Sequence, residues 1–318
     1  MKILIAEYAV GGGGGNSKNK NKNKGASLLR EGKAMLSTLK NGFERQGYEV
    51  VYPEAEADFE AAVDKLSKES DAGIVIAPDD QLYALTKLVE SNTVNLGCPV
   101  EFVKICTDKL LTSKVLSEEG IPVPGIVSMD EVEKNEEQRY VSKPRYGCAA
   151  ESIFILNGEK DHETLSLYNN NNSPDHNHII MDFIEGDDVS SSIIAGKSSI
   201  LPLTINKQFI KEEGGRLRYK GGLIPYSIGD EAEGRIMRIS KKVVTMLHGE
   251  GYVGIDFILG ADGKAYVVDV NPRPTTSIVG IAEVLNYDVV DLIFRAKFGT
   301  LPSVEEVKTE GRFVFNLT

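Results

Sequence analysis

The first hundred residues alternate short apolar runs with longer segments whose apolar positions recur every three to four residues. The short runs are typical of buried β-strands and the longer segments of amphipathic helices. The pattern predicts strands at 2–6, 48–51 and 73–77, and helices at 28–46, 58–67 and 81–91. Because strands that alternate with helices form a parallel sheet covered by those helices, we expect an α/β unit first.

After residue 105 the pattern changes to consecutive strands. A helix is expected at 107–119, with Thr107 as its cap and Gly120 as its stop. Alternating apolar residues then predict antiparallel strands at 139–143, 152–156, 179–184, 189–195 and 199–204, and helices at 233–250 and 284–298. The fold class is therefore α/β, with α+β lobes following the parallel unit.

Residues 252–271, YVGIDFILGADGKAYVVDVN, predict a β-hairpin, because two apolar runs flank the turn-forming pair Asp262-Gly263. A two-residue turn there pairs residues whose numbers add to 525, which sets Asp256 opposite Asp269. Side chains two apart share a face of the sheet, so Asn271 joins the two carboxylates.

Directly opposed carboxylates repel each other, and a divalent cation between them would remove the repulsion. Carboxylate and amide oxygens are hard ligands that suit Mg²⁺ and leave positions for phosphate and water. The alternative is an exposed hairpin with acidic residues on its solvent face. Spacing by itself does not decide between the two.

Composition narrows the class of protein. The chain has 318 residues, 41% of them hydrophobic, enough for two or three lobes with buried cores. No apolar run approaches the roughly 20 residues that span a bilayer, and the start lacks a signal-peptide cleavage pattern. Cys98, Cys106 and Cys148 lack metal-ligand spacing, which favours buried thiols in a reducing cytoplasm. The net charge of −11 argues against broad nucleic-acid binding.

Two segments are of low complexity. Residues 11–25, GGGGGNSKNKNKNKG, and residues 168–178, which contain four consecutive Asn, are expected to be loops. The glycine run does not support a dinucleotide-binding fingerprint, since the third glycine would fall at Asn16 and the helix starts too late.

Two lysines are candidates for contact with phosphate. Lys143 ends a strand before a turn of small residues at 147–150, whose amides would add donors. Lys109 lies in the first turn of a helix. The alternative for each is an ordinary surface lysine.

Residues 181–190, MDFIEGDDVS, run from an apolar strand through Glu-Gly into a second strand. Backbone groups at such a crossing are able to read an adenine edge, and Asp188 is able to accept from ribose hydroxyls. The alternative is a β-arc with an acidic turn. Downstream, Pro272 and Pro274 fix the backbone around Arg273 and aim it beside the acidic cluster, which suits an anionic substrate.

The order of these motifs resembles the ATP-grasp superfamily over roughly 109–277: a helix ending GIPVP, then VSKP, MDFIEGDDVS, GYVGIDF and YVVDVNPRP. The resemblance implies an ATP-grasp fold behind an N-terminal α/β domain, with ATP as cofactor and two Mg²⁺ (or Mn²⁺) ions. It implies phosphate contacts from Lys109 and Lys143, adenine contacts from the backbone of Asp182, Phe183 and Ile184, a ribose contact from Asp188, metal ligation by Asp256, Asp269 and Asn271, and a substrate or transition-state contact from Arg273.

Two departures affect these assignments. The superfamily often has Glu where this chain has Asp269, and its glycine loop is usually richer than GCAAE at 147–151.

Within the superfamily, IAEYAVGGGG, SLLREGKAML and VNPRPTTSIVGI resemble the archaeal ligases that join tyramine to L-glutamate in methanofuran biosynthesis. This implies that ATP activates the γ-carboxylate as an acyl phosphate, which the amine then attacks. The alternatives are another amino-acid ligase, of the pyrrolysine-pathway type, or a nucleotide-binding protein without catalysis. Small-molecule substrates, no nucleic acid, no membrane and a homodimer are expected at the level of the family.

The expected domains are 1–105, a parallel α/β unit; 106–186, a small ATP-grasp lobe; and 187–318, a large lobe with the metal and phosphate site. Glu7, at the end of the first strand, is a candidate for binding an incoming ammonium, with a structural role as the alternative. Residues 204–208 and 216–222 are expected to form a mobile flap near substrate, with Asn206, Gln208 or Arg218 as contacts.

Overall fold

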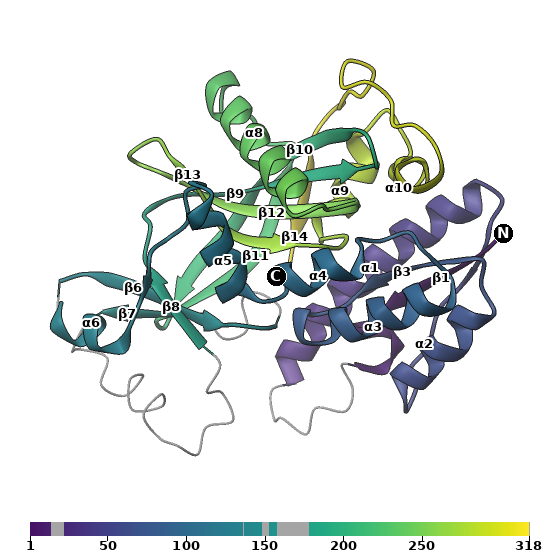
Figure 1. The fold of residues 1–318 in the computed structure, drawn as a ribbon, viewed down its shortest axis with the longest axis horizontal. Helices are drawn as coiled ribbons and strands as arrows, with labels where there is room; N and C mark the ends of the chain where they lie inside the picture. The colour runs from purple at the N-terminus through teal and green to yellow at the C-terminus, as the bar shows by residue number, and fades with distance from the viewer. Residues whose placement is uncertain (14–21, 136, 148–152, 158–177, 318) are drawn as a thin grey trace.

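The fold, taken from a computed structural model, contains two β-sheets that lie side by side (Figure 1). The structure describes residues 1–13, 22–135, 137–147, 153–157 and 178–317. The expected loop at 168–178 and residues 14–21 of the glycine- and lysine-rich segment therefore lie outside the described residues, apart from His178.

The N-terminal sheet is parallel and four-stranded, with strand order β2-β1-β3-β4. Its strands are β1 (Lys2–Glu7), β2 (Glu49–Val51), β3 (Ala72–Ile76) and β4 (Val94–Asn95). The expected helices are α1 (Lys22–Arg45), α2 (Phe59–Lys68) and α3 (Asp79–Asn92), and a short π-helix, η1 (Ala9–Gly13), follows β1. The alternation of strand and helix thus correctly predicted a parallel α/β sheet.

The apolar periodicity did not predict the start of α1 or one short helix. Helix α1 begins six residues before the predicted start, because its first turns carry no large apolar residue. Helix α4 (Val100–Cys106) was not predicted, since seven residues are too few to show a period. The predicted cap of the next helix, α5 (Lys109–Glu118), was wrong: Asp108, not Thr107, accepts the capping hydrogen bond from Leu111, whereas the Thr107 hydroxyl donates back into α4.

The second sheet is antiparallel and, within the described residues, ten-stranded. Its order is β13-β12-β9-β10-β11-β7-β6-β8-β5, and β14 pairs with β11. The strands are β5 (Ile126–Val127), β6 (Arg139–Pro144), β7 (Phe154–Asn157), β8 (His178–Asp182), β9 (Gly186–Ala195), β10 (Ile200–Glu213), β11 (Arg216–Ile224), β12 (Gly251–Gly260), β13 (Ala265–Asn271) and β14 (Phe313–Asn316). The remaining helices are α6 (Met129–Lys134), α8 (Asp230–Met246), α9 (Ser277–Val284) and α10 (Val289–Phe298).

Two predictions for the second half were wrong. Residues 204–208 and 216–222 are not a flap but parts of β10 and β11, which pair along their length as a long hairpin. The closing helix predicted at 284–298 begins only at Val289, as α10, because Leu285 pairs with Thr309 in an isolated bridge and Asp288 caps α10 at Val290. The preceding helix, α9, was not predicted. The hairpin has a local signal that the sequence analysis did not use, because Gly214 and Gly215, both at positive φ, form the two-residue turn between Glu213 and Arg216.

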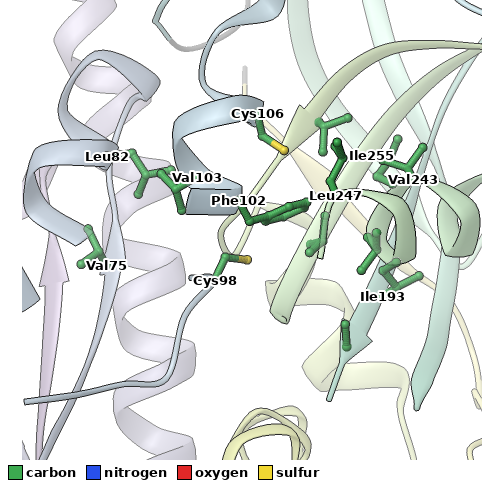
Figure 2. Packing of buried hydrophobic residues seen from close by; sticks show 14 of the residues in the cluster. Val75, Leu82, Cys98, Phe102, Val103, Cys106, Ile193, Val243, Leu247 and Ile255 are labelled. Carbon is green, nitrogen blue, oxygen red and sulfur yellow. The ribbon is translucent and has the colours of Figure 1, made fainter. Parts of the chain in front are cut away.

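A continuous hydrophobic core joins the two sheets. Helix α4 lies between them, and Figure 2 shows Cys98, Phe102 and Cys106 facing side chains of the second sheet and of α8 while Val103 faces the N-terminal unit. The thiols of Cys98 and Cys106 are buried as expected, and Cys148 lies outside the described residues. The core therefore fixes the N-terminal sheet against the antiparallel sheet.

Candidate active site

A cavity of about 590 Å³ lies between the parallel unit and the antiparallel sheet. All ten residues that the family resemblance assigned to nucleotide, metal or substrate line this cavity, whereas Glu7 does not. The structure assembles them from α5, β6, β8, the β8–β9 link, β9, β12, β13 and the segment after β13. They are Lys109, Lys143, Asp182, Phe183, Ile184, Asp188, Asp256, Asp269, Asn271 and Arg273.

The acidic hairpin has the predicted pairing but not the predicted turn. Asp256 pairs with Asp269, as expected. Next to the turn, however, Gly260 pairs with Lys264, so three residues form the turn and Gly263 takes the left-handed conformation, with φ of 75°. A β-bulge compensates for the extra turn residue. Val268 has no partner on β12, so Asp269 returns to the predicted pairing with Asp256.

Burial is the main influence on the protonation of Asp256. Burial raises the pKa of Asp256 to about 7, and the charge of Asp269 adds to the rise. Hydrogen bonds from Gln208 (2.9 Å) and from the Asn271 amide (3.2 Å) to the Asp256 carboxylate oppose it.

The donor set fits a hard divalent cation. Two opposed carboxylates and a neighbouring amide supply oxygen ligands, and a cation between the carboxylates would relieve the repulsion between them. No group of three His, Cys, Asp or Glu side chains with metal-binding geometry occurs in the described part of the chain. The remaining ligands would therefore come from water or phosphate.

Lys109 is not a surface lysine but a buried one. Its side chain is 5% exposed and forms ion pairs with Asp79 and, at 3.5 Å, with Asp269. Its ammonium also donates to the carbonyl of Gly147 at 3.1 Å. Burial disfavours the charge, but Asp269 and Asp79 outweigh that effect and raise the pKa of Lys109 above its usual range.

Asp79 was missed by the sequence analysis. It is the first residue of α3 and is 4% exposed, so the parallel unit contributes a charged side chain to this site. A signal was present, because Asp79 follows a buried strand of a parallel sheet at the edge where ligands bind. The same position, at the edge of the sheet where ligands bind, was the reason to select Glu7 at the end of the neighbouring strand, β1.

Lys143 is held by the bulge in the hairpin. Its ammonium donates to the carbonyl of Val268 at 2.6 Å, which joins the end of β6 to β13. Burial lowers the pKa of Lys143 to about 8, although the nearby Asp269 acts in the opposite direction. The residues that follow the next turn, 148–152, lie outside the described residues, so the expected small-residue loop is described only at Gly147.

Arg273 carries an unsatisfied polar atom. Its Nε is buried and has no hydrogen-bond partner among the described residues. Its other nitrogens make long contacts, to the carbonyl of Pro274 at 3.3 Å and to the Asn271 side chain at 3.4 Å. A buried guanidinium with spare donors is suited to bind a carboxylate or phosphate.

The link between β8 and β9 presents backbone groups to the other end of the cavity. The Asp182 amide donates to Gly125 and the Phe183 amide to Arg139, whereas the Ile184 amide has no acceptor among the described residues. Gly186 permits a close crossing, since a Cβ there would lie 2.3 Å from the Leu259 carbonyl oxygen. Burial raises the pKa of Asp188 in this region.

Four other residues considered from sequence have clear positions. Asn206, Gln208 and Arg218 line the cavity, although from strands and not from a flap. Glu7 is 4% exposed and accepts a hydrogen bond from the Val10 amide at 2.7 Å. Helix α1 forms a further wall of the cavity, which the sequence analysis did not predict.

The chain belongs to the ATP-grasp family: residues 106–277 match the model of the ATP-grasp domain. This confirms the fold inferred from the motifs, and the chain is an ATP-dependent, ADP-forming carboxylate–amine ligase of a fold that binds ATP with Mg²⁺. None of the described helices has the length and apolarity that crossing a membrane requires.

Three known proteins illustrate the similarity. The chain is 30% identical to the tyramine–L-glutamate ligase of Methanocaldococcus jannaschii over 280 residues, 80% of this chain and 79% of that protein. It is 29% identical to the same ligase of Methanocaldococcus fervens, over 80% of this chain and 83% of the relative. The crystal structure of an ATP-grasp superfamily protein from Archaeoglobus fulgidus superimposes with a TM-score of 0.73 at 25% identity, covering 99% of this chain and 92% of the other.

Proposed function

We propose that this enzyme joins the γ-carboxylate of L-glutamate to tyramine, forming γ-glutamyltyramine, ADP and phosphate, as a step in methanofuran biosynthesis. The activity named for the two Methanocaldococcus relatives supports this choice of substrates. The observation that carries the proposal is the convergence of two opposed carboxylates, two buried lysines and an unsatisfied guanidinium in one cavity.

The buried charges would bind and activate the nucleotide. We assign Lys109 and Lys143 to the ATP phosphates, because both ammonium groups lie beside Asp269 in a dry environment where charge–charge interactions are strong. Asp256, Asp269 and Asn271 would hold two Mg²⁺ (or Mn²⁺) ions. When bound, these ions neutralise phosphate charge as the γ-phosphoryl group is transferred.

The link between β8 and β9 would hold the nucleoside. The Ile184 amide would donate to the adenine edge, and the carbonyl of Asp182 would accept from it, since the Asp182 amide already donates to Gly125. Asp188 would accept from the ribose hydroxyls. These contacts place the base at the end of the cavity away from Arg273.

Arg273 would position the acid for activation. Its unsatisfied Nε would bind a carboxylate oxygen of glutamate beside the phosphate site. The γ-phosphoryl group then passes to the side-chain carboxylate oxygen as ADP leaves. The amine nitrogen attacks the acyl carbon and loses a proton, and phosphate departs as the amide bond forms. Alignment and charge neutralisation supply most of the catalysis in such transfers.

A mass-spectrometric assay with ATP, Mg²⁺, L-glutamate and tyramine tests the proposed reaction. We expect γ-glutamyltyramine together with stoichiometric ADP. If ADP and an amide form only with a different acid or amine, the ligase class stands and the substrate assignment is wrong.

Asp269→Ala tests the metal assignment. We expect a loss of turnover of roughly 10³-fold or more, because the phosphate charge would lose its main counter-ion site. Asp262→Ala, at the exposed tip of the same hairpin, is the matched control and should retain activity. Circular dichroism and thermal melting would show whether both variants fold. A folded Asp269→Ala enzyme with full activity would remove Asp269 from the site.

A further inference from the structure

The cavity has a wall that the assignments above leave without a role. It is formed by helix α1, from which Ser27, Leu28, Glu31 and Met35 line the cavity. Tyr219 and Ile224 of β11 and Thr276 line the same cavity. The segment SLLREGKAML, noted in the sequence, thus contributes directly to the site.

Glu31 lies next to the segment that carries Arg273. The Thr276 hydroxyl donates to the Glu31 carboxylate at 2.7 Å, and Thr276 follows Arg273 by three residues. At Gly32, helix α1 also passes close to the end of β1, because a Cβ there would lie 2.6 Å from both carboxylate oxygens of Glu7. Helix α1 therefore packs closely on the end of β1, and this packing fixes the position of Glu31.

Tyr219 connects this wall to the acidic hairpin. Burial raises the pKa of the Tyr219 phenol, and the charges of Glu31 and of Asp256 both add to the rise. The phenol thus lies within the electrostatic influence of both carboxylates. The wall of α1 lines the same cavity as the acidic hairpin and Arg273.

The chemistry of this wall distinguishes between the two substrates. A carboxylate beside Leu28, Met35 and Ile224 fits a cationic amine with an apolar body. Glutamate is a poor match, because it carries two carboxylates and only a short aliphatic chain, and Glu31 would repel its net negative charge. Arg273 offers the acid a cationic partner instead.

We propose that Glu31 binds the ammonium group of the amine substrate and that Leu28 and Met35, with Tyr219, contact its apolar body. Helix α1 then determines which amine the ligase accepts. This inference rests on the proposed function for the identity of the reaction but concerns a separate set of residues.

Steady-state kinetics with tyramine, glutamate and ATP test the role of Glu31. We expect Glu31→Gln to raise the KM for tyramine at least about tenfold, the loss typical of a charged hydrogen bond, and to change the KM for glutamate and for ATP by less than about twofold. Glu44→Gln is the matched control, since Glu44 is on the same helix but 46% exposed and paired with Lys40. Its KM values should equal those of the wild type.

Leu28→Ala tests the apolar contact independently. We expect the KM for tyramine to rise about fivefold and the KM for ethylamine, which lacks the ring, to stay within about twofold. Leu29→Ala, at the adjacent position that does not line the cavity, is the control. Thermal melts of all variants would separate a lost contact from a lost fold.

Two results would overturn the inference. One is an unchanged KM for tyramine in both Glu31→Gln and Leu28→Ala. The other is a rise in the KM for glutamate in place of tyramine, which would assign Glu31 to the ammonium of the acid. If the wild type uses another amine, the substrate assignment fails, and the same variants measured with that amine still decide the role of α1.

Discussion

Buried charge is the main feature of this protein at the scale of single residues. Glu7, Asp79, Lys109 and Lys143 are each less than a tenth exposed. A buried charge is costly unless it is paired, so such groups accumulate where a ligand requires them. The cost is visible at Glu7, where burial raises the pKa to about 7 despite a hydrogen bond from Val10.

We expect Glu7 to make stability depend on pH. Between about pH 4.5 and pH 7, unfolded Glu7 loses its proton while folded Glu7 keeps it, so the free energy of unfolding falls as pH rises, by up to about 3 kcal/mol, and is then constant. Glu7→Gln removes this dependence. Urea denaturation of both proteins from about pH 5 to about pH 8 measures it. A constant difference across that range would contradict the assignment.

At the scale of elements, the hairpin of β12 and β13 carries the most information. Its turn has one residue more than the sequence indicated, and the bulge at Val268 compensates for it. The bulge has a second consequence, since the Val268 carbonyl accepts from Lys143. A local irregularity thus sets the register of two carboxylates and anchors a lysine from a distant strand.

Two glycine substitutions should change the free energy of unfolding in opposite directions. Gly263→Ala places a side chain at φ of 75° and should lower the free energy of unfolding by about 1 kcal/mol. Gly234→Ala, in the interior of α8 with nothing within 4 Å of an added Cβ, should raise it by about 0.5 to 1 kcal/mol. Denaturant titration measures both. Equal shifts in one direction would contradict this account of the turn.

At the scale of the whole molecule, both sheets share one hydrophobic core. The predicted boundary at 105/106 crosses α4, whose Phe102 is buried between the two sheets together with Cys98, just before the helix (Figure 2). Gly249 permits this packing, because a Cβ there would lie 2.9 Å from the Phe102 ring. We retain the division at 1–105, 106–186 and 187–318 as a proposal about family architecture, not as a claim of independent folding.

We expect the intact chain to unfold in a single thermal transition, whereas a fragment of residues 1–105 should aggregate, because it would expose Phe102 and Cys98. Differential scanning calorimetry and size-exclusion chromatography would test this. Two separate transitions in the intact chain, or a monomeric, folded fragment, would show that the sheets do not depend on each other.

The sequence by itself determined the fold class and the pairing of Asp256 with Asp269, and it predicted ten residues that line one cavity. These follow from local signals: apolar periodicity, a turn dipeptide, and motifs whose order is typical of a family. Only the tertiary structure decided the burial of Lys109, the contribution of Asp79, the bulge at Val268 and the wall of α1. Each of these depends on contacts between segments far apart in the chain, and no local pattern encodes which distant side chain fills a given space.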